Sequence, residues 1–194
     1  MRPPKNYNPE IHHRRSIRFL GFDYTQGGLY FITICCKDRA CLFGAVKNGT
    51  MELSSAGEIA NACWQEIPDH FPNVLLHEYI IMPNHVHGII ELANPANDGA
   101  GHISPAPDVF NDDRKIFPTD TGTTLRSPSK TIGSIVRGFK IGVTKWFRAN
   151  GCYDSIWQRN YYEHIIKDEK SYLNIAAYII NNPVKWQEDK WYMK

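Results

Sequence analysis

Some segments of the chain have the hydrophobic pattern of strands and others have the spacing of helices. The strand-like segments are described first. Residues 29–36 are rich in tyrosine, phenylalanine, isoleucine and threonine and follow two glycines, a pattern typical of a strand. Residues 42–46 and 50–53 flank Asn48 and Gly49, which tolerate positive φ, and therefore predict a tight β-hairpin. Residues 74–82 and 86–92 lie on either side of Pro83 and Asn84 and predict a second hairpin.

Three other segments show the spacing of helices. Residues 56–67 follow two serines, either of which can cap a helix, and their apolar pattern is broken by prolines 68 and 72. Residues 131–149 carry the clearest apolar face and end at Asn150 and Gly151. After a strand-like run at 156–166, residues 168–182 predict a last helix that ends before Pro183. Hairpins with helices between them predict an α+β fold, an antiparallel sheet with helices packed on it.

Two segments show neither the strand-like nor the helical pattern. One precedes the predicted domain and the other interrupts it. Residues 1–18 form a basic N-terminal arm, and residues 93–128 hold five prolines without sustained apolar periodicity, which predicts a loop insertion. A chain of 194 residues has the length of one domain. We therefore expect one domain over residues 19–186, containing the insertion, and a tail at 187–194.

Composition narrows the class of protein. With 42% hydrophobic residues and a net charge of +2, the chain has enough apolar surface for a core and no overall bias toward a polyanion. Five cysteines without CxxC spacing do not form a secreted disulfide framework, so we expect a cytoplasmic protein. No apolar run approaches the roughly 18 residues of a membrane span. Neither a GxxxxGK nor a GxGxxG motif occurs, which disfavours a nucleotide triphosphatase or a dinucleotide enzyme.

The first candidate site is the pair His85 and His87 in the run MPNHVHGII. Side chains alternate across a strand, so both imidazoles are expected on one side, where they could hold a metal ion. The alternative is an ordinary pair of histidines at the start of a strand. A hydrolase motif of three alternating histidines is excluded because Ile89 occupies the third position. Gly88 is expected to make room for the backbone of a ligand.

The last helix carries the second candidate site. Tyr178 and Asn182 are four residues apart and therefore lie one turn from each other, where they could act as nucleophile and metal ligand. The alternatives are a tyrosine at the rim of the core and an asparagine that caps the helix. Leu173, Ala177 and Ile180 are expected to form the apolar stripe of this helix.

Charge gives a third observation. Between Leu125 and Asn150 there are six basic residues and no acidic one, which favours a phosphate-binding surface over an ordinary solvated helix face. These residues are Arg126, Lys130, Arg137, Lys140, Lys145 and Arg148. In the N-terminal arm, Arg14, Arg15 and Arg18 either contribute to such a surface or belong to a solvated tail.

Three runs in this order, MPNHVHG, IWQRNYYEHII and YIINNPVKW, resemble the single-tyrosine HUH transposases, most closely the REP-associated tyrosine transposases. The resemblance spans roughly residues 15–186, apart from the insertion. It implies the ferredoxin-like or RRM-like fold of HUH endonucleases, and it makes residues 19–186 a catalytic domain. Single-stranded or hairpin DNA is the implied partner, bound by a monomer or homodimer.

The resemblance also implies roles for the candidate residues. His85 and His87 would bind Mg²⁺ or Mn²⁺, with Asn182 as the third ligand unless His164 takes that role. Tyr178 would attack DNA and form a 5′-phosphotyrosine, so that strands are cut and rejoined. Basic residues outside the metal site, namely Arg14, Arg15, Arg18, Lys130, Arg137, Lys140, Lys145 and Arg148, would contact DNA. Two alternatives remain, an inactive regulator that binds hairpin DNA and a small metal-dependent hydrolase.

Overall fold

The computed structural model of the protein describes residues 27–93, 131–189 and 192. Outside these ranges lie the predicted arm, nearly all of the predicted insertion, and five of the basic residues named above, Arg14, Arg15, Arg18, Arg126 and Lys130. The described elements are β1 (Gly28–Cys35), η1 (Lys37–Arg39), β2 (Gly44–Lys47), β3 (Thr50–Leu53), α1 (Ser55–Gln65), α2 (Ile67–His70), β4 (Val74–Met82), β5 (His85–Leu92), α3 (Ile132–Ala149), β6 (Tyr162–Ile166), α4 (Glu169–Ile180) and η2 (Trp186–Glu188).

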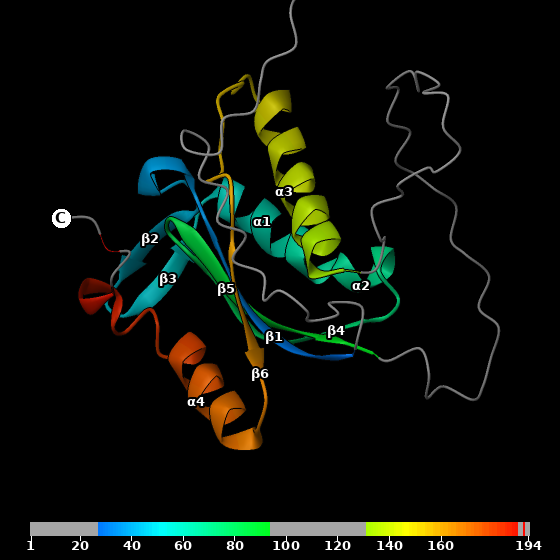
Figure 1. The fold of residues 1–194 in the computed structure, drawn as a ribbon. Coiled ribbons are helices and arrows are strands. Elements are labelled where there is room, and N and C mark those ends of the chain that lie inside the picture. The colour runs from blue at the N-terminus through cyan, green and yellow to red at the C-terminus, as the bar shows by residue number, and fades with distance from the viewer. Residues whose placement is uncertain (1–26, 94–130, 190–191, 193–194) are drawn as a thin grey trace, which may run out of the picture.

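A four-stranded sheet in the order β4-β5-β1-β6 forms the centre of the molecule, and β2 and β3 pair in a separate hairpin (Figure 1). Every pairing in both sheets is antiparallel. The predicted turn at Asn48 and Gly49 is confirmed, because both residues adopt positive φ, 52° and 74°. The structure thus confirms the predicted α+β architecture.

One face of the sheet carries the larger core, under α1 and α3 (Figure 1). Tyr30 and Ile32 of β1 and Ile90 of β5 point to this face and are fully buried. Trp64 of α1 and Phe139 of α3 pack edge to face above them, with ring centroids 5.4 Å apart. Side-chain oxygens of Ser54 and Thr131 cap the two helices by accepting hydrogen bonds from backbone N–H groups of their first turns.

Gly88 of β5 faces this core, so its expected role in admitting a ligand is wrong. A Cβ atom at position 88 would collide with the indole ring of Trp64. The glycine therefore lets the α1 tryptophan approach the sheet, which is a packing function.

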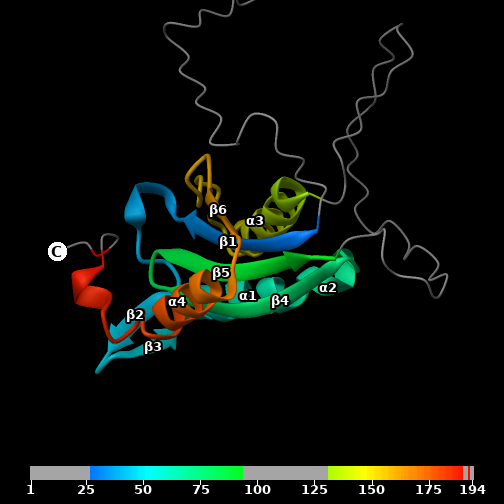
Figure 2. The ribbon, with the colours of Figure 1, turned by 60° about the horizontal axis from the view of Figure 1, so that its bottom comes forward.

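The opposite face of the sheet is covered by α4, which crosses in front of β4 and β5 in Figure 2. Ala176 and Ile179 pack there on Ile89 and Ile166. The predicted apolar stripe of this helix is wrong, because Leu173, Ala177 and Ile180 are all exposed. The helix instead turns toward the sheet the preceding positions, Ala176 and Ile179. Partly buried Tyr172 and Ile175 pack against the same cluster.

The last strand is also shorter than predicted. Only Tyr162–Ile166 pairs regularly with β1, whereas the chain before it makes a single bridge between Trp157 and Cys36. Trp157 turns toward the core, where its ring lies 5.6 Å from those of Phe43 and Phe139. This packing holds the segment as an irregular loop. In the described part of the chain, no helix has both the length and the apolar character to cross a membrane.

Candidate active site

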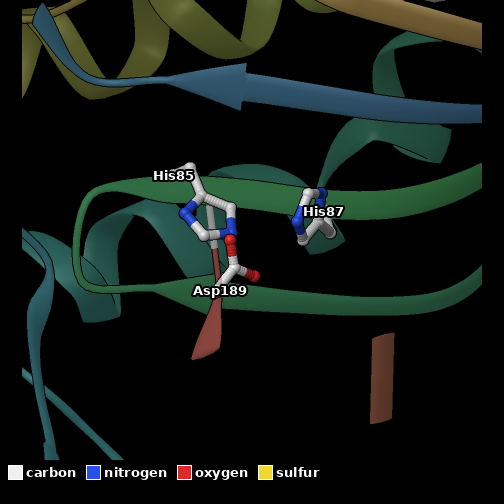
Figure 3. Close-up of side chains that lie close together, drawn as sticks. All are labelled: His85, His87 and Asp189. Atoms are coloured by element: carbon white, nitrogen blue, oxygen red, sulfur yellow. The ribbon is translucent and has the colours of Figure 1, made fainter. Parts of the chain in front are cut away.

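His85 and His87 both project from β5 toward the face covered by α4, as the spacing predicts (Figure 3). Their rings lie 4.3 Å apart between centroids, and both side chains are buried. On the paired strand β1, Thr33 lies opposite His87 and Phe31 packs its ring 5.3 Å from the His87 ring. The two imidazoles are therefore held in fixed orientations by the sheet.

Hydrogen bonds set which ring nitrogen can bind a metal ion. His85 Nδ1 lies 2.8 Å from Oδ1 of Asn84, whose Nδ2 donates to the carbonyl oxygen of Arg39. Because the amide oxygen can only accept, His85 Nδ1 carries the proton, and Nε2 keeps its lone pair. His87 Nδ1 lies 2.9 Å from Thr33 Oγ1, a partner that leaves Nε2 directed to the site. In histidines that bind a metal through one ring nitrogen, the other ring nitrogen usually makes a hydrogen bond of this kind.

Tyr178 comes from α4, yet its hydroxyl lies 3.2 Å from His87 Nε2, a residue 91 positions earlier in the chain. The same hydroxyl donates to Asp189 Oδ2 at 3.3 Å. Burial, followed by the nearby Asp189 carboxylate, raises the pKa of Tyr178 to about 12. At neutral pH the phenol therefore keeps its proton and needs an acceptor for it before it can act as a nucleophile.

Asn182 follows α4 and brings a second polar side chain to the histidines. Its Nδ2 donates to Asp189 Oδ2 at 3.0 Å. Among the described residues its Oδ1 has no hydrogen-bond partner, although the side chain is only 2% exposed. A buried amide oxygen without a donor is costly in an apolar setting, and a cation beside it would remove that cost. The residues present thus fit a bound metal ion.

Asp189 was missed as a site residue from the sequence. Its segment follows the YIINNPVKW run and shows no periodicity, and we expected a tail there. In the structure, Trp186 packs against His85 with ring centroids 5.9 Å apart, and the turn of η2 then brings the carboxylate back to the histidines. Ligand atoms of His85, His87 and Asp189 all lie within 4.8 Å of one another and could together hold a metal ion (Figure 3).

The other predicted site residues lie elsewhere. His164 is exposed on β6 and does not belong to that group of candidate ligands. Arg137, Lys145 and Arg148 are exposed on α3, which lies across the sheet from α4, the helix that carries Tyr178 (Figure 1). Lys140 on the same helix donates to the carbonyl oxygens of Gln158 and Asn160, at 2.8 and 3.2 Å, so its ammonium group secures the irregular loop.

Two proteins of known sequence and one solved structure are similar to this chain. No protein-family model matches the chain. An uncharacterized protein of Haemophilus influenzae is 48% identical over 190 residues, 96% of this chain and 97% of the relative. A second protein of that organism, named "Putative REP-associated tyrosine transposase", is 31% identical over 163 residues, which cover 84% of this chain and 74% of the relative.

A solved structure of a REP-associated tyrosine transposase bound to a REP hairpin has the same fold, with a TM-score of 0.54. It shares 19% sequence identity and aligns over 91% of this chain and 76% of the other. At this identity the structural likeness concerns the fold, and the family assignment comes from the sequence relative. The histidine pair and the helix that carries Tyr178 thus occur in a chain that belongs to the family of REP-associated tyrosine transposases.

Proposed function

We propose that the protein cleaves and rejoins single-stranded or hairpin DNA through a 5′-phosphotyrosine on Tyr178. The observation that carries the proposal is the 3.2 Å distance between the Tyr178 hydroxyl and His87 Nε2. A tyrosine placed at the rim of the core for packing alone would not need to meet a buried histidine pair. The family, and the hairpin bound to the structurally similar transposase, support DNA as the substrate.

The donor atoms of the site favour particular metal ions. His85, His87, Asp189 and Asn182 would supply two imidazole nitrogens, a carboxylate oxygen and an amide oxygen. This mixture suits Mn²⁺, and Mg²⁺ is bound by such sites mainly because it is abundant. A divalent cation held by these residues would supply charge neutralisation at the phosphodiester oxygens and so lower the barrier to attack.

The protein's own groups can carry the proton and the bond exchange. Asp189 Oδ2, already in contact with the Tyr178 hydroxyl, accepts its proton as the phenolic oxygen attacks phosphorus. The bond from phosphorus to the 3′ oxygen breaks, and that oxygen leaves as a hydroxyl after it takes up a proton. Because the phosphodiester energy is kept in the tyrosine ester, a strand's 3′-hydroxyl can reverse the reaction and join DNA.

The test is covalent capture of a labelled hairpin oligonucleotide in Mn²⁺. We expect an adduct with the unmodified protein and none with Tyr178→Phe. Tyr162→Phe is the matched control, because Tyr162 is also half exposed and its ring also packs on the edge of Phe31 at 6.3 Å. An adduct that survives Tyr178→Phe would exclude this nucleophile.

Two other functions give different results in the same assay. A regulator that only binds hairpins would retain binding in EDTA and form no adduct. A small metal-dependent hydrolase would keep its activity in Tyr178→Phe and would not respond to DNA.

A further inference from the structure

A hollow of about 360 Å³ lies beside Tyr178, between the exposed flank of α4 and the turn that follows the helix. Besides the site residues, it is lined by Asn174, Ala177, Asn181, Lys185 and Glu188. None of these five residues has a role in the metal site or in the proton transfer described above. The hollow is nevertheless continuous with the site, since Tyr178, Asn182 and Asp189 form part of its wall.

The sequence of α4 explains the shape of this hollow. Asn174, Ala177 and Asn181 are spaced by three and four residues and therefore share one face of the helix. The small side chain of Ala177 leaves a depression between the two carboxamides. Asn181 Nδ2 donates to the carbonyl oxygen of Ala177 at 2.7 Å, so the amide oxygen of Asn181 remains as an acceptor.

Charge indicates what kind of group the hollow can accept. Because Asp189 belongs to the metal site, the remaining charged groups of the wall are one ammonium group, from Lys185, and one carboxylate, from Glu188. This balance gives no net attraction for a second phosphate and suits a neutral group that offers donors and acceptors along an edge. The volume is at the lower end of the range for small-ligand pockets, and a single nucleobase with part of its sugar is a ligand of that size.

We propose that the hollow holds the base of the nucleotide whose 5′ phosphate is attacked by Tyr178, and that Asn174, Asn181 and Lys185 set the base preference there. This inference rests on the proposed function, because the 5′-phosphotyrosine keeps the downstream nucleotide attached to Tyr178. Its base then lies within reach of side chains one turn away on the same helix.

The chemistry of the wall predicts which bases are favoured. Glu188 accepts a hydrogen bond from an exocyclic amino group, and an asparagine amide or Lys185 donates to the adjacent ring nitrogen. Adenine and cytosine present this pair of groups on one edge, whereas thymine has no amino group. We therefore expect adenine or cytosine to be preferred over thymine on the 3′ side of the cut.

Covalent capture from a library tests the inference. Hairpin oligonucleotides with a randomised single-stranded flank are incubated with the protein in Mn²⁺, and the DNA that becomes attached is sequenced. The first nucleotide of each attached strand is the one assigned to the hollow. We expect adenine or cytosine to exceed thymine there by roughly 10-fold, within the discrimination that one good side-chain pair gives. In Asn174→Ala and in Lys185→Ala the ratio should fall below about 3, with preferences at other positions unchanged.

Lys170→Ala is the matched control, because Lys170 is an exposed lysine of α4 that does not line the hollow. It should keep the preference of the unmodified protein. Capture with no bias at the first nucleotide, or with a bias unchanged in both hollow variants, would overturn the inference and leave the proposed function standing. No capture by the unmodified protein would overturn the proposed function, and this inference with it.

Discussion

The two faces of the central sheet are built from different kinds of residue. Beneath α1 and α3, the described residues form a large and almost wholly apolar core that includes Tyr30, Trp64 and Phe139. Beneath α4 the apolar cluster is small, and buried polar side chains, His85, His87 and Asn182, lie beside it. The difference separates two tasks, since one face supplies most of the hydrophobic stabilisation and the other holds groups that are costly to bury.

This separation follows from the alternation of side chains along β5. Val86, Ile90 and Leu92 point to the larger core, while His85 and His87 point to α4. Val86, the residue between the two histidines, therefore packs in the larger core while its neighbours serve the site. A sheet built in this way tolerates a polar site because its fold depends mainly on the opposite face.

Removing a large side chain from each face tests whether the two faces contribute unequally to stability. Trp64 is 1% exposed, and Trp64→Ala should lower the free energy of unfolding by about 3 to 5 kcal/mol. Ile179, also 1% exposed, lies in the small cluster, and Ile179→Ala should cost about 2 kcal/mol because α4 can move in to fill the space. Urea unfolding followed by circular dichroism measures both values.

The variant that loses more stability, Trp64→Ala, should keep more activity than Ile179→Ala. At a temperature where both are folded, Trp64→Ala should form the DNA adduct at nearly the normal rate. Ile179→Ala should be slower, because a shift of α4 moves the Tyr178 hydroxyl away from His87. Equal losses of stability, or an adduct rate that depends only on stability, would show that the two faces are not distinct.

The sequence predicted the elements well because their signals are local. Strand alternation, the turn at Asn48 and Gly49 and the capping residues each depend on a few neighbouring residues, and the structure contains all of them. Alternation also correctly placed His85 and His87 on one side of a strand. The predictions that failed depended on what packs against an element. The stripe of α4 and the role of Gly88 depended on a distant partner, the sheet in one case and Trp64 in the other.

Asp189 shows the same limit within the site. Nothing near it in the sequence marks the residue, because its position depends on Trp186 packing against His85, about 100 residues earlier in the chain. Lys140 shows a contact that its charge alone does not predict. Its ammonium group donates to the carbonyl oxygens of Gln158 and Asn160, and its contact with DNA stays a prediction.

The second prediction concerns the basic residues on the side of the larger core. We propose that Arg137, Lys145 and Arg148, all exposed on α3, contact DNA phosphates away from the cut. Replacing all three by alanine should remove about three phosphate contacts, and log affinity should then fall with log salt less steeply, by about 2 in slope. Between 50 and 200 mM salt, the affinity of the unmodified protein should therefore fall by a factor roughly 20 times larger than that of the variant. Fluorescence anisotropy with a labelled hairpin measures it.

A variant with Lys37, Lys47 and Lys170 replaced by alanine has the same net charge and serves as control. These lysines are exposed but lie off α3, so the slope should change little. Cleavage of a short single strand should be unaffected in the α3 variant, because that strand need not reach beyond α4. A slope identical in the two triple variants would remove α3 from the DNA-binding surface.

The smallest effect is expected from a polar network that anchors α4. Tyr172 donates its hydroxyl to Glu78 Oε2 at 2.7 Å and lies 3.3 Å from His77 Nδ1. His77 Nε2 in turn lies 2.8 Å from Glu91 Oε2 on β5. The hydrogen bond from Tyr172 lowers the pKa of Glu78, so the carboxylate form is favoured. The start of α4 is thus joined to β4 by direct polar contacts and, through His77, to β5.

Tyr172→Phe keeps the ring and removes only this hydroxyl, so it tests whether the network positions Tyr178 six residues later. We expect the rate of adduct formation at saturating DNA to fall roughly 3- to 10-fold, because small misplacements of a reacting group are costly. Affinity for the hairpin should not change, and the free energy of unfolding should fall by about 1 kcal/mol. Tyr161→Phe is the control, since Tyr161 makes a similar hydrogen bond to Glu163 at 3.1 Å but lies outside α4. If both variants slow the reaction equally, or if Tyr172→Phe weakens DNA binding instead of the rate, the network only stabilises the fold.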